Sequence, residues 1–474
     1  MASGQARGAR GARTAVLEAV AGWVPGEPVR NEALPASWGV DDQWVRTRTG
    51  IASRHRAGPG TATGDLAYEA ARLLIGDAGG GVVPAGPVAR RGSGAHRGYG
   101  ARGGLAGSGF HGGLVGAGIH GGPEDSGAGC ERAACGAAVD RAVDGVDAVD
   151  AVVLATATPD HPCPATAPEL AARLGLGAVP AFDLGAVCSG FVYGLAVCHG
   201  LVVSGLYDRV LLVGADTYST WLDPRDRSAG VVFGDGAGAA LIAAGRTGSP
   251  GELLGFDLGS DGAGRELITV AGGGSRSRSR TGPPVPERSV PGQAAGGDAA
   301  GQAAGTRTAG QSAGAGTAVP AAGAGTAGQA AGGDAFFRMR GRAVYQHAVE
   351  RMTGSCRSLL TTVGWDAAQV DHFVPHQANA RILRAVADRV GIGADRCVTH
   401  LDRVGNTGAA SIPLALADAA ARGRFRAGDR VLLTAFGGGL TWGTAALSWP
   451  GTVRAAPLDG RYAPWEGTHH DGDG

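Results

Sequence analysis

Three residues of this 474-residue chain, Cys188, His376 and Asn406, carry side chains suited to covalent catalysis. Cys188 lies where an apolar strand-like stretch ends and a helix-like one begins, and Asn406 holds the corresponding position in a second, similar segment. A helix N-terminus presents unpaired N–H groups and positive partial charge, which favour a thiolate nucleophile. His376 ends the strand-like run HFVPH, the edge at which α/β sheets place their ligands. A small buried core thiol is the alternative for Cys188, but the SGF turn after it and the paired Asn406 favour the nucleophile.

These positions belong to an internal duplication. In the first half VDAVVLATATPD is followed by a helix-like stretch (165–176), the segment with Cys188, and the strand RVLLVGA. In the second half VDHFVPHQAN is followed by a helix-like stretch (380–390), the segment with Asn406, and the strand RVLLTAFG. Each half ends on a Gly-rich turn, at 233–243 and 436–449. Strands alternating with helices indicate an α/β architecture with largely parallel sheets. We therefore expect one duplicated domain, with an N-terminal half over 1–260, a C-terminal half over 261–455 and a loose tail over 456–474.

Two Gly-rich tracts interrupt this pattern, at about 77–140 and 272–334. Both are poor in large apolar residues and cannot offset the entropy of ordering, so they are interpreted as flexible insertions. The first tract contains histidines and cysteines whose spacing matches no zinc motif, namely His96, His111, His120, Cys130 and Cys135. We expect no metal site there.

Composition excludes several classes of partner. The formal net charge is zero and every basic side chain is arginine, so bulk charge favours neither nucleic acid nor an anionic membrane. No apolar stretch reaches 18 residues, and Ala15–Val24 is interpreted as a first strand rather than part of a signal peptide. Seven cysteines without paired spacing fit a reducing compartment, so we expect a cytoplasmic protein.

The remaining cysteines and histidines of the duplicated region are interpreted as structural. Cys163, Cys198, Cys356 and Cys397 are expected to be core side chains by default. His372 is expected to be structural and to face away from His376, and a packing role is favoured for His347.

With these residues in place, the motifs DLGAVCSGF, VPHQAN and VGNTGAAS, in that order, resemble the Cys–His–Asn set of beta-ketoacyl-acyl carrier protein synthase III, a family of the thiolase superfamily. The segments at 41–55, 223–240 and 435–447 resemble further signatures of that family. The resemblance covers nearly the whole chain outside the two tracts. It implies a thiolase-like fold with duplicated α/β/α/β/α layers and two mixed sheets, assembled as a homodimer.

The family resemblance also implies a mechanism. Cys188 would take an acyl group from an acyl-CoA, with an oxyanion hole formed by the N–H groups of Cys188 and Gly438. His376 and Asn406 would then stabilise the enolate of malonyl-acyl carrier protein as CO₂ leaves. The product is a 3-oxoacyl-carrier protein, which initiates fatty acid biosynthesis. No metal or redox cofactor is expected, and acyl-CoA and the carrier protein are the partners.

Binding residues follow from the same resemblance. Trp44 and Arg227 match the pair that sandwiches the adenine of CoA, Arg48 falls near the CoA phosphates, and Asn379 lines the pantetheine tunnel. Arg381, Arg384 and Arg389 correspond to the docking helix for the acidic carrier protein, with a solvated helix face as the alternative.

One departure concerns Cys163, which replaces a phenylalanine frequent in the family at the dimer contact that closes the acyl pocket. A smaller side chain predicts room for a primer longer or more branched than acetyl.

Other functions remain open at this level. Within the fold, a degradative thiolase would need a second cysteine in the last Gly-rich turn, and GGGLTWG has none. Elongation synthases use two histidines, and plant-type polyketide synthases have a GFGPG turn that is missing here. The main alternative is a starter-unit ketosynthase III or an acyltransferase of polyketide or secondary metabolism. A non-catalytic binding protein with a decayed site is disfavoured by the complete Cys–His–Asn set.

Overall fold

The computed structural model describes residues 11–75, 149–275 and 335–450, which all fall within one compact unit. The first predicted insertion, the second from residue 276 onward and the predicted tail lie outside the described residues.

The first sheet has five strands in the order β1-β7-β6-β4-β5. The pairs β6–β4 and β4–β5 are parallel, whereas β7 runs antiparallel to both β1 and β6. In sheet order the strands are β1 (Arg13–Trp23), β7 (Gly236–Arg246), β6 (Arg209–Asp216), β4 (Ala151–Ala155) and β5 (Ala181–Leu184).

The second sheet has four strands in the order β11-β12-β13-β8, of which β11–β12 is parallel and the other two pairs are antiparallel. Its strands are β11 (His372–Pro375), β12 (Arg430–Gly437), β13 (Thr441–Ser448) and β8 (Leu253–Ser260). Both sheets are mixed, as the family resemblance implies. The expectation of largely parallel sheets, which was drawn from strands alternating with helices, is therefore wrong. The three residues between β12 and β13 allow only an antiparallel hairpin, because a parallel pair needs a crossover of a dozen residues.

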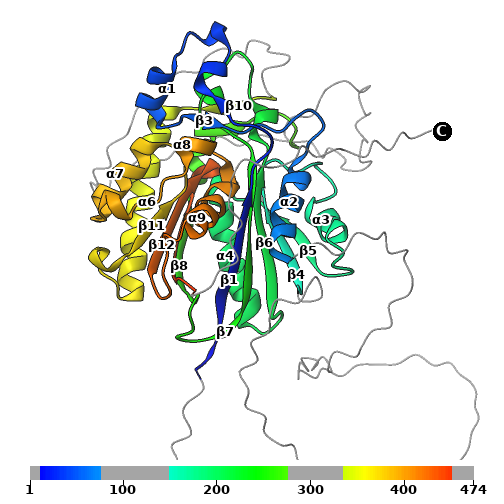
Figure 1. Ribbon diagram of the computed structural model, residues 1–474, viewed down its shortest axis with the longest axis vertical. Helices are drawn as coiled ribbons and strands as arrows, with labels where there is room; N and C mark the ends of the chain where they lie inside the picture. Colours follow the sequence, from blue (N-terminus) through cyan, green and yellow to red (C-terminus); the bar gives the residue numbers. More distant parts are fainter. Residues whose placement is uncertain (1–10, 76–148, 276–334, 451–474) are drawn as a thin grey trace, which may run out of the picture. The chain divides into compact units, whose positions relative to one another are not determined.

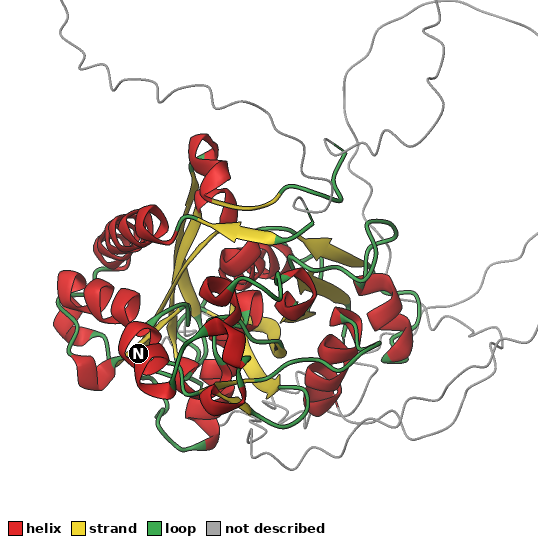
Figure 2. Cartoon of the chain, turned by 90° about the horizontal axis from the view of Figure 1, so that it is seen from above, coloured by secondary structure: helices red, strands yellow, loops and turns green. Residues whose placement is uncertain are grey.

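Five layers result (Figure 1). Helices α4 (Gly190–Val203) and α9 (Ser411–Ala421) fill the space between the sheets. Helices α2 (Thr63–Ile75) and α3 (Ala167–Arg173) cover the outer face of the first sheet, and α6 (Gly341–Val363) and α7 (Ala380–Val390) cover that of the second. Figure 2 shows the same arrangement from above, with strands in yellow between helices in red. This layering is the thiolase-like arrangement that the family resemblance implies.

Helices cover both faces of each sheet, which explains why the inner strands are apolar along most of their length. In β6, Val210 and Leu212 face the central helices while Leu211 and Val213 face the outer ones. The run RVLLV is thus buried on both faces, as expected for an inner strand of a covered sheet. Strand β12 repeats the pattern in the second half of the chain.

Shorter elements complete the described part of the chain around one end of the layers. They are the strands β2 (Val29–Arg30), β3 (Ser53–Arg54), β9 (Ile268–Val270) and β10 (Phe337–Met339), and the helices α1 (Asp42–Thr49), α5 (Arg227–Gly230) and α8 (Leu401–Val404). The predicted helix over 380–390 is α7, whereas α3 is shorter than the predicted 165–176. No helix within the described residues is long and apolar enough to cross a membrane.

Candidate active site

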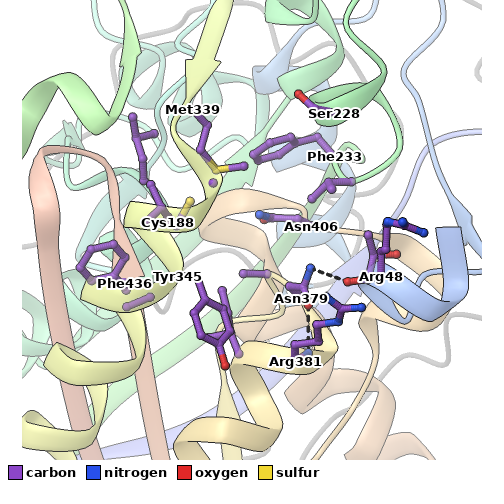
Figure 3. A pocket seen from close by; sticks show the side chains of 18 of the residues that line it. Arg48, Cys188, Ser228, Phe233, Met339, Tyr345, Asn379, Arg381, Asn406 and Phe436 are labelled. Carbon is purple, nitrogen blue, oxygen red and sulfur yellow. Dashed lines mark hydrogen bonds between the residues drawn. The ribbon is translucent and has the colours of Figure 1, made fainter. Parts of the chain in front are cut away.

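Cys188, His376 and Asn406 all line one cavity of about 450 Å³. They come from three separate elements that meet at the end of the central layer, and Figure 3 shows Cys188 and Asn406 facing the same space. The cavity wall carries Arg48, Arg342 and Arg381, and the described lining contains no Asp or Glu. The surrounding wall is therefore apolar and electropositive.

Cys188 sits in the 3₁₀ turn Val187–Ser189, directly before α4. Val187 holds the left-handed backbone conformation (φ 49°), which an L side chain rarely adopts, so the turn is strained at the cysteine. Burial raises the pKa of the Cys188 thiol to about 12, and a hydrogen bond with Tyr218 opposes this rise. The sequence argument that a helix N-terminus alone favours the thiolate is therefore incomplete, because it left out the desolvation of the charged sulfur.

His376 follows β11 and is buried. Its Nδ1 lies 2.6 Å from Ser411 Oγ, which also accepts the N–H of Gln377 at 3.3 Å. The Ser411 hydroxyl hydrogen has no other acceptor among the described residues, so the hydroxyl donates to Nδ1. The Nε2 atom then carries the ring proton. Burial lowers the pKa of His376 to about 3, so the imidazole stays neutral.

Asn406 is held by a loop of the first half of the chain. Its backbone N–H donates to Val232 O at 2.9 Å, and its carbonyl accepts the N–H of Gly234 at 3.0 Å. The two segments approach so closely that a Cβ at Gly234 would lie 2.3 Å from Val404 O, and one at Gly405 would lie 2.8 Å from Val232 O. Glycine is needed at both positions.

The amide of Asn406 is oriented as well, because its Oδ1 accepts the N–H of Gly408 at 3.0 Å. Its Nδ2 makes no hydrogen bond within the described residues and is available to the cavity. The expectation that a strand precedes Asn406 is wrong, since the preceding residues form α8. The site thus offers two neutral N–H donors, from His376 and Asn406, beside a thiol.

Gly438 lies beside the turn of Cys188. The preceding Gly437 brings β12 so near that a Cβ there would be 2.8 Å from Cys188 N. The turn and loop hydrogen bonds of the described chain engage neither the Cys188 N–H nor the Gly438 N–H. Two N–H groups in neighbouring turns are the composition of an oxyanion hole.

Trp44 lines the cavity, and two arginines lie near its ring. The guanidinium of Arg48 stacks 4.3 Å from the indole centroid, and that of Arg227 lies 5.5 Å from it. A planar base between Trp44 and Arg227 needs about 7 Å, twice the ~3.5 Å contact distance between carbons. A planar ring would therefore fit between Trp44 and Arg227 only if the two side chains moved apart, and Arg227 is held at present by a hydrogen bond to Trp38 O.

Asn379 also lines the cavity, and it is the N-cap of α7. Its Oδ1 accepts the Arg381 N–H and its Nδ2 donates to Arg48 O (Figure 3). This position is therefore fixed by its own hydrogen bonds. The side chains of Arg381, Arg384 and Arg389 are exposed on α7, and Arg381 alone of the three lines the cavity.

A second cavity of about 610 Å³ adjoins the turn of Cys188 from another side and includes Gly438 in its wall. Val187 and Tyr218 line it, and Ile268 and Phe337 line both cavities. The sequence argument missed Tyr218 and Ser411. Ser411 could have been found from its place in the VGNTGAAS motif, whereas no local pattern marks Tyr218.

The structural interpretation of the other side chains holds in part. Cys198 and Cys356 are buried in the core as predicted, and Cys397 is half-buried. Cys163 is exposed, so its default interpretation as a core cysteine is wrong. His372 bonds Asp429 at 2.9 Å, away from the cavity, and His347 is half-buried on α6.

The described residues contain no group of three or more side chains that could hold a metal ion. The five histidines and cysteines weighed as a metal site in the first insertion lie outside the described residues.

Comparisons with known proteins agree on one family. Residues 182–262 match the family model of 3-Oxoacyl-[acyl-carrier-protein (ACP)] synthase III, and residues 360–449 match the model of its C-terminal part. "Beta-ketoacyl-[acyl-carrier-protein] synthase III 5" of Streptomyces coelicolor is 42% identical, with 92% of this chain and 97% of the relative covered. The homologous synthase III of Pseudomonas aeruginosa strain LESB58 is 37% identical over 93% of this chain and 98% of its own length. The crystal structure of 3-oxoacyl-(acyl carrier protein) synthase III from Pseudomonas aeruginosa PAO1 superposes with a TM-score of 0.64 at 35% identity, covering 92% of this chain and 98% of that one.

Proposed function

This chain belongs to the beta-ketoacyl-[acyl-carrier-protein] synthase III family, and from that premise we propose how Cys188, His376 and Asn406 perform its reaction. The family's enzymes are acyltransferases of the condensing type, which start fatty acid biosynthesis by joining an acyl-CoA primer to malonyl-acyl carrier protein. The convergence of a thiol and two oriented N–H donors on one cavity carries the assignment of residues.

In the first half-reaction, the Cys188 sulfur attacks the thioester carbonyl of the acyl-CoA. A carbon–sulfur bond to Cys188 forms, the bond to the CoA sulfur breaks, and the thiol proton leaves with CoA. The carbonyl oxygen becomes anionic in between, and the N–H groups of Cys188 and Gly438 stabilise it. Removing one such donor typically costs about 2.7–4 kcal/mol of transition-state stabilisation.

In the second half-reaction, malonyl-carrier protein enters the same cavity. Nε2–H of His376 and Nδ2–H of Asn406 donate to the malonyl thioester carbonyl, so that loss of CO₂ leaves a stabilised enolate. The enolate carbon attacks the acyl-Cys188 carbonyl, the thioester bond to Cys188 breaks, and a 3-oxoacyl-carrier protein forms. A neutral imidazole suits this role because it donates a hydrogen bond without forming a buried cation. We propose that no metal or redox cofactor takes part.

The test is incubation with malonyl-carrier protein and acyl-CoA, with product masses read for wild type and three variants. Cys188→Ala is expected to lose both acyl-enzyme and product. His376→Ala and Asn406→Ala are expected to keep the acyl-enzyme and to lower condensation by about 10²–10³-fold each. Acyl transfer without a 3-oxoacyl product from wild type would instead favour the acyltransferase alternative. Normal condensation by Cys188→Ala would refute the assignment of the nucleophile.

The electropositive mouth supports binding of two anionic partners. We assign the CoA nucleotide to Trp44, Arg48 and Arg227 and the pantetheine arm to the cavity wall at Asn379. The exposed arginines of α7, Arg381, Arg384 and Arg389, are proposed to dock the acidic carrier protein.

A charge reversal on α7 tests this docking surface. Arg384 makes no hydrogen bond or ion pair with another described residue, so Arg384→Glu is expected to raise KM for the carrier protein without changing acylation by acyl-CoA. Arg426→Glu is the control, since Arg426 is exposed near the start of β12, whose other end reaches the cavity. Equal effects of the two reversals would exclude specific docking on α7.

The oligomeric state is a proposal as well. Strand β5 is an edge of the first sheet, pairs only with β4 among the described strands, and leaves Phe182 38% exposed. An unpaired edge strand with an exposed aromatic is a template for pairing with a second copy. We propose a homodimer through this edge, in the cytoplasm where acyl-CoA and carrier protein are available. Size-exclusion chromatography with light scattering tests the dimer, and a monomer at micromolar concentration would exclude it.

We also propose that this enzyme accepts primers longer or more branched than acetyl. Cys163 lies in neither cavity wall and is exposed in the single chain, so its effect on the acyl pocket depends on the partner subunit. Acylation of Cys188 with a graded series of acyl-CoAs tests this, and strict acetyl preference would contradict it.

A further inference from the structure

The hydroxyl of Tyr218 lies 3.7 Å from the Cys188 sulfur, within hydrogen-bonding range for sulfur. Tyr218 is completely buried, and its hydroxyl has no other hydrogen-bond partner among the described residues. Buried tyrosine hydroxyls usually find a good acceptor, and a neutral thiol is a weak one. A thiolate is a much better acceptor. The pairing is therefore matched to the charged form of the sulfur.

The ring of Tyr218 is held in this position from several sides. It stacks on Phe233 at 4.7 Å between centroids, and Trp221 and Phe337 contact it edge-on at 5.8 and 5.9 Å. Gly408, in the turn before α9, makes room for it, since a Cβ there would lie 2.3 Å from Tyr218 Cε2. The phenol cannot turn away from the sulfur without displacing these neighbours.

The charges around the sulfur make such a donor useful. Asp216, at the end of β6, is fully buried and accepts hydrogen bonds from Ala157 N, Ala409 N, Thr156 and Thr158. Burial of the site raises the pKa of the Cys188 thiol, and negative charge on Asp216 adds to this rise, while burial also raises the pKa of Asp216 to about 7. His376, across the cavity, is neutral, and Phe436 and Gly437 of the neighbouring strand carry no charge. The Arg265–Glu266 ion pair belongs to the wall of the second cavity.

We propose that Tyr218 is a catalytic residue whose phenol donates a hydrogen bond to the Cys188 thiolate and so makes the nucleophile available for acylation. The phenol keeps its proton throughout, because burial and the adjacent sulfur raise the pKa of Tyr218 well above its usual value. Together with the N-terminus of α4, it offsets part of the desolvation of the charged sulfur. The inference rests on the proposed role of Cys188 as nucleophile.

The test compares Tyr218→Phe with wild type by alkylating Cys188 with iodoacetamide across a pH series and quantifying the Cys188 peptide by mass spectrometry. The variant keeps the ring and its contacts and loses only the hydroxyl. We expect the thiolate fraction of Cys188 at a given pH to fall about tenfold (about 1.4 kcal/mol). A more basic thiolate is more nucleophilic, so alkylation at fixed pH is expected to slow about three- to fourfold.

Tyr193→Phe is the matched control. Tyr193 lies on α4, and its hydroxyl donates to Gly259 O at 2.8 Å, so this variant also loses one tyrosine hydrogen bond near the site. An unshifted profile in Tyr218→Phe, or an equal shift in both variants, would overturn the proposal.

If Tyr218→Phe does not fold, the protein with 3,5-difluorotyrosine at position 218 is used for the test, because its more acidic phenol is a stronger hydrogen-bond donor. Faster alkylation of Cys188 supports the inference, and an unchanged rate overturns it. Alkylation of Cys188 does not depend on condensation, so the role of Tyr218 can fail this test while the proposed function stands. Failure of the proposed function would instead be revealed by normal condensation in Cys188→Ala.

Discussion

His400 offers a quantitative test of how the neighbourhood of the site responds to pH. Its side chain is 1% exposed, and neither ring nitrogen has a hydrogen-bond partner among the described residues. Burial lowers the pKa of His400 to about 3, and the nearby charges of Asp418, Arg403 and Arg422 largely oppose one another. His400 is adjacent to the loop that carries His376, because Gln377 Oε1 accepts its backbone N–H at 2.8 Å.

The sign of the effect follows from proton binding. In the unfolded chain a histidine has a pKa of about 6.5, so below that pH the unfolded state takes up a proton that the native state does not. Stability contributed by the neutral His400 is therefore present above pH 6.5 and is lost as pH falls toward 3. Between pH 7 and pH 5 this single group removes about 2 kcal/mol of the free energy of unfolding.

His400→Leu removes the titration and the two unpartnered nitrogens while preserving most of the volume. We expect its loss of stability between pH 7 and pH 5 to be smaller than that of wild type by about 2 kcal/mol. The assay is urea unfolding at both pH values, followed by tryptophan fluorescence. Buried carboxyl groups such as Asp216 titrate equally in both proteins and cancel in the comparison.

The control is His400→Gln, which removes the titration and retains a polar group. It should show the same reduced pH dependence without a gain in stability at pH 7. If both variants lose as much stability between pH 7 and pH 5 as wild type, then His400 is protonated in the native state and the reasoning from burial fails.

Three further predictions concern the groups proposed to be catalytic. Ser411→Ala should slow condensation about tenfold (about 1.4 kcal/mol) at unchanged KM, because Nδ1 of His376 loses its hydrogen-bond donor and the ring tautomer is no longer selected. Ser411→Thr should restore the rate. A change confined to thermal stability would count against this role of Ser411. The rate of decarboxylation of malonyl-carrier protein should not fall through protonation of His376 between pH 8 and pH 5, because burial lowers the pKa of His376 to about 3. A fall in the rate of CO₂ release centred near pH 6.5, measured by stopped flow, would contradict a neutral buried donor. Gly405→Ala should lower the free energy of unfolding by about 1–3 kcal/mol, because alanine is strained at φ 72°, and should reduce condensation more than acylation, because its Cβ pushes the Asn406 loop away from Val232. Thermal melts measure the loss of stability, and separate assays of acylation and condensation measure the two rates. Equal loss of the two half-reactions would argue against a local effect.

The layered fold could be predicted because its determinants are repeated and local. Apolar runs such as RVLLV mark strands covered on both faces, and the duplication indicates two similar halves. The gathering of Cys188, His376 and Asn406 at one cavity was predictable for the same reason, since each follows or precedes an element with a clear pattern. The antiparallel strand pairs could not be predicted, because pairing direction depends on the lengths of the connections between strands rather than on side-chain periodicity.

Contacts between distant segments account for what the sequence could not reveal. The Tyr218 hydroxyl reaches Cys188 from the end of β6, across a separation of 30 residues, and no periodicity marks that meeting. The isolation of both His400 nitrogens likewise depends on segments that pack around it in three dimensions. Cys163 was misassigned because small residues of this type are usually buried, whereas its loop lies at the surface.

Cys188 precedes α4 and Asn406 precedes α9, and these two helices begin against each other: a Cβ at Gly190 would lie 3.5 Å from the Cβ of Ala409. Each helix start adds positive potential within its first turn, worth about 0.3–1 kcal/mol for an adjacent anion and up to ~2 when partly buried. The reaction creates negative charge twice, first at the primer carbonyl and then at the malonyl unit. In the proposed mechanism both charges arise beside the same pair of helix starts, so the two similar halves of the chain together supply one electrostatic environment for both chemical steps.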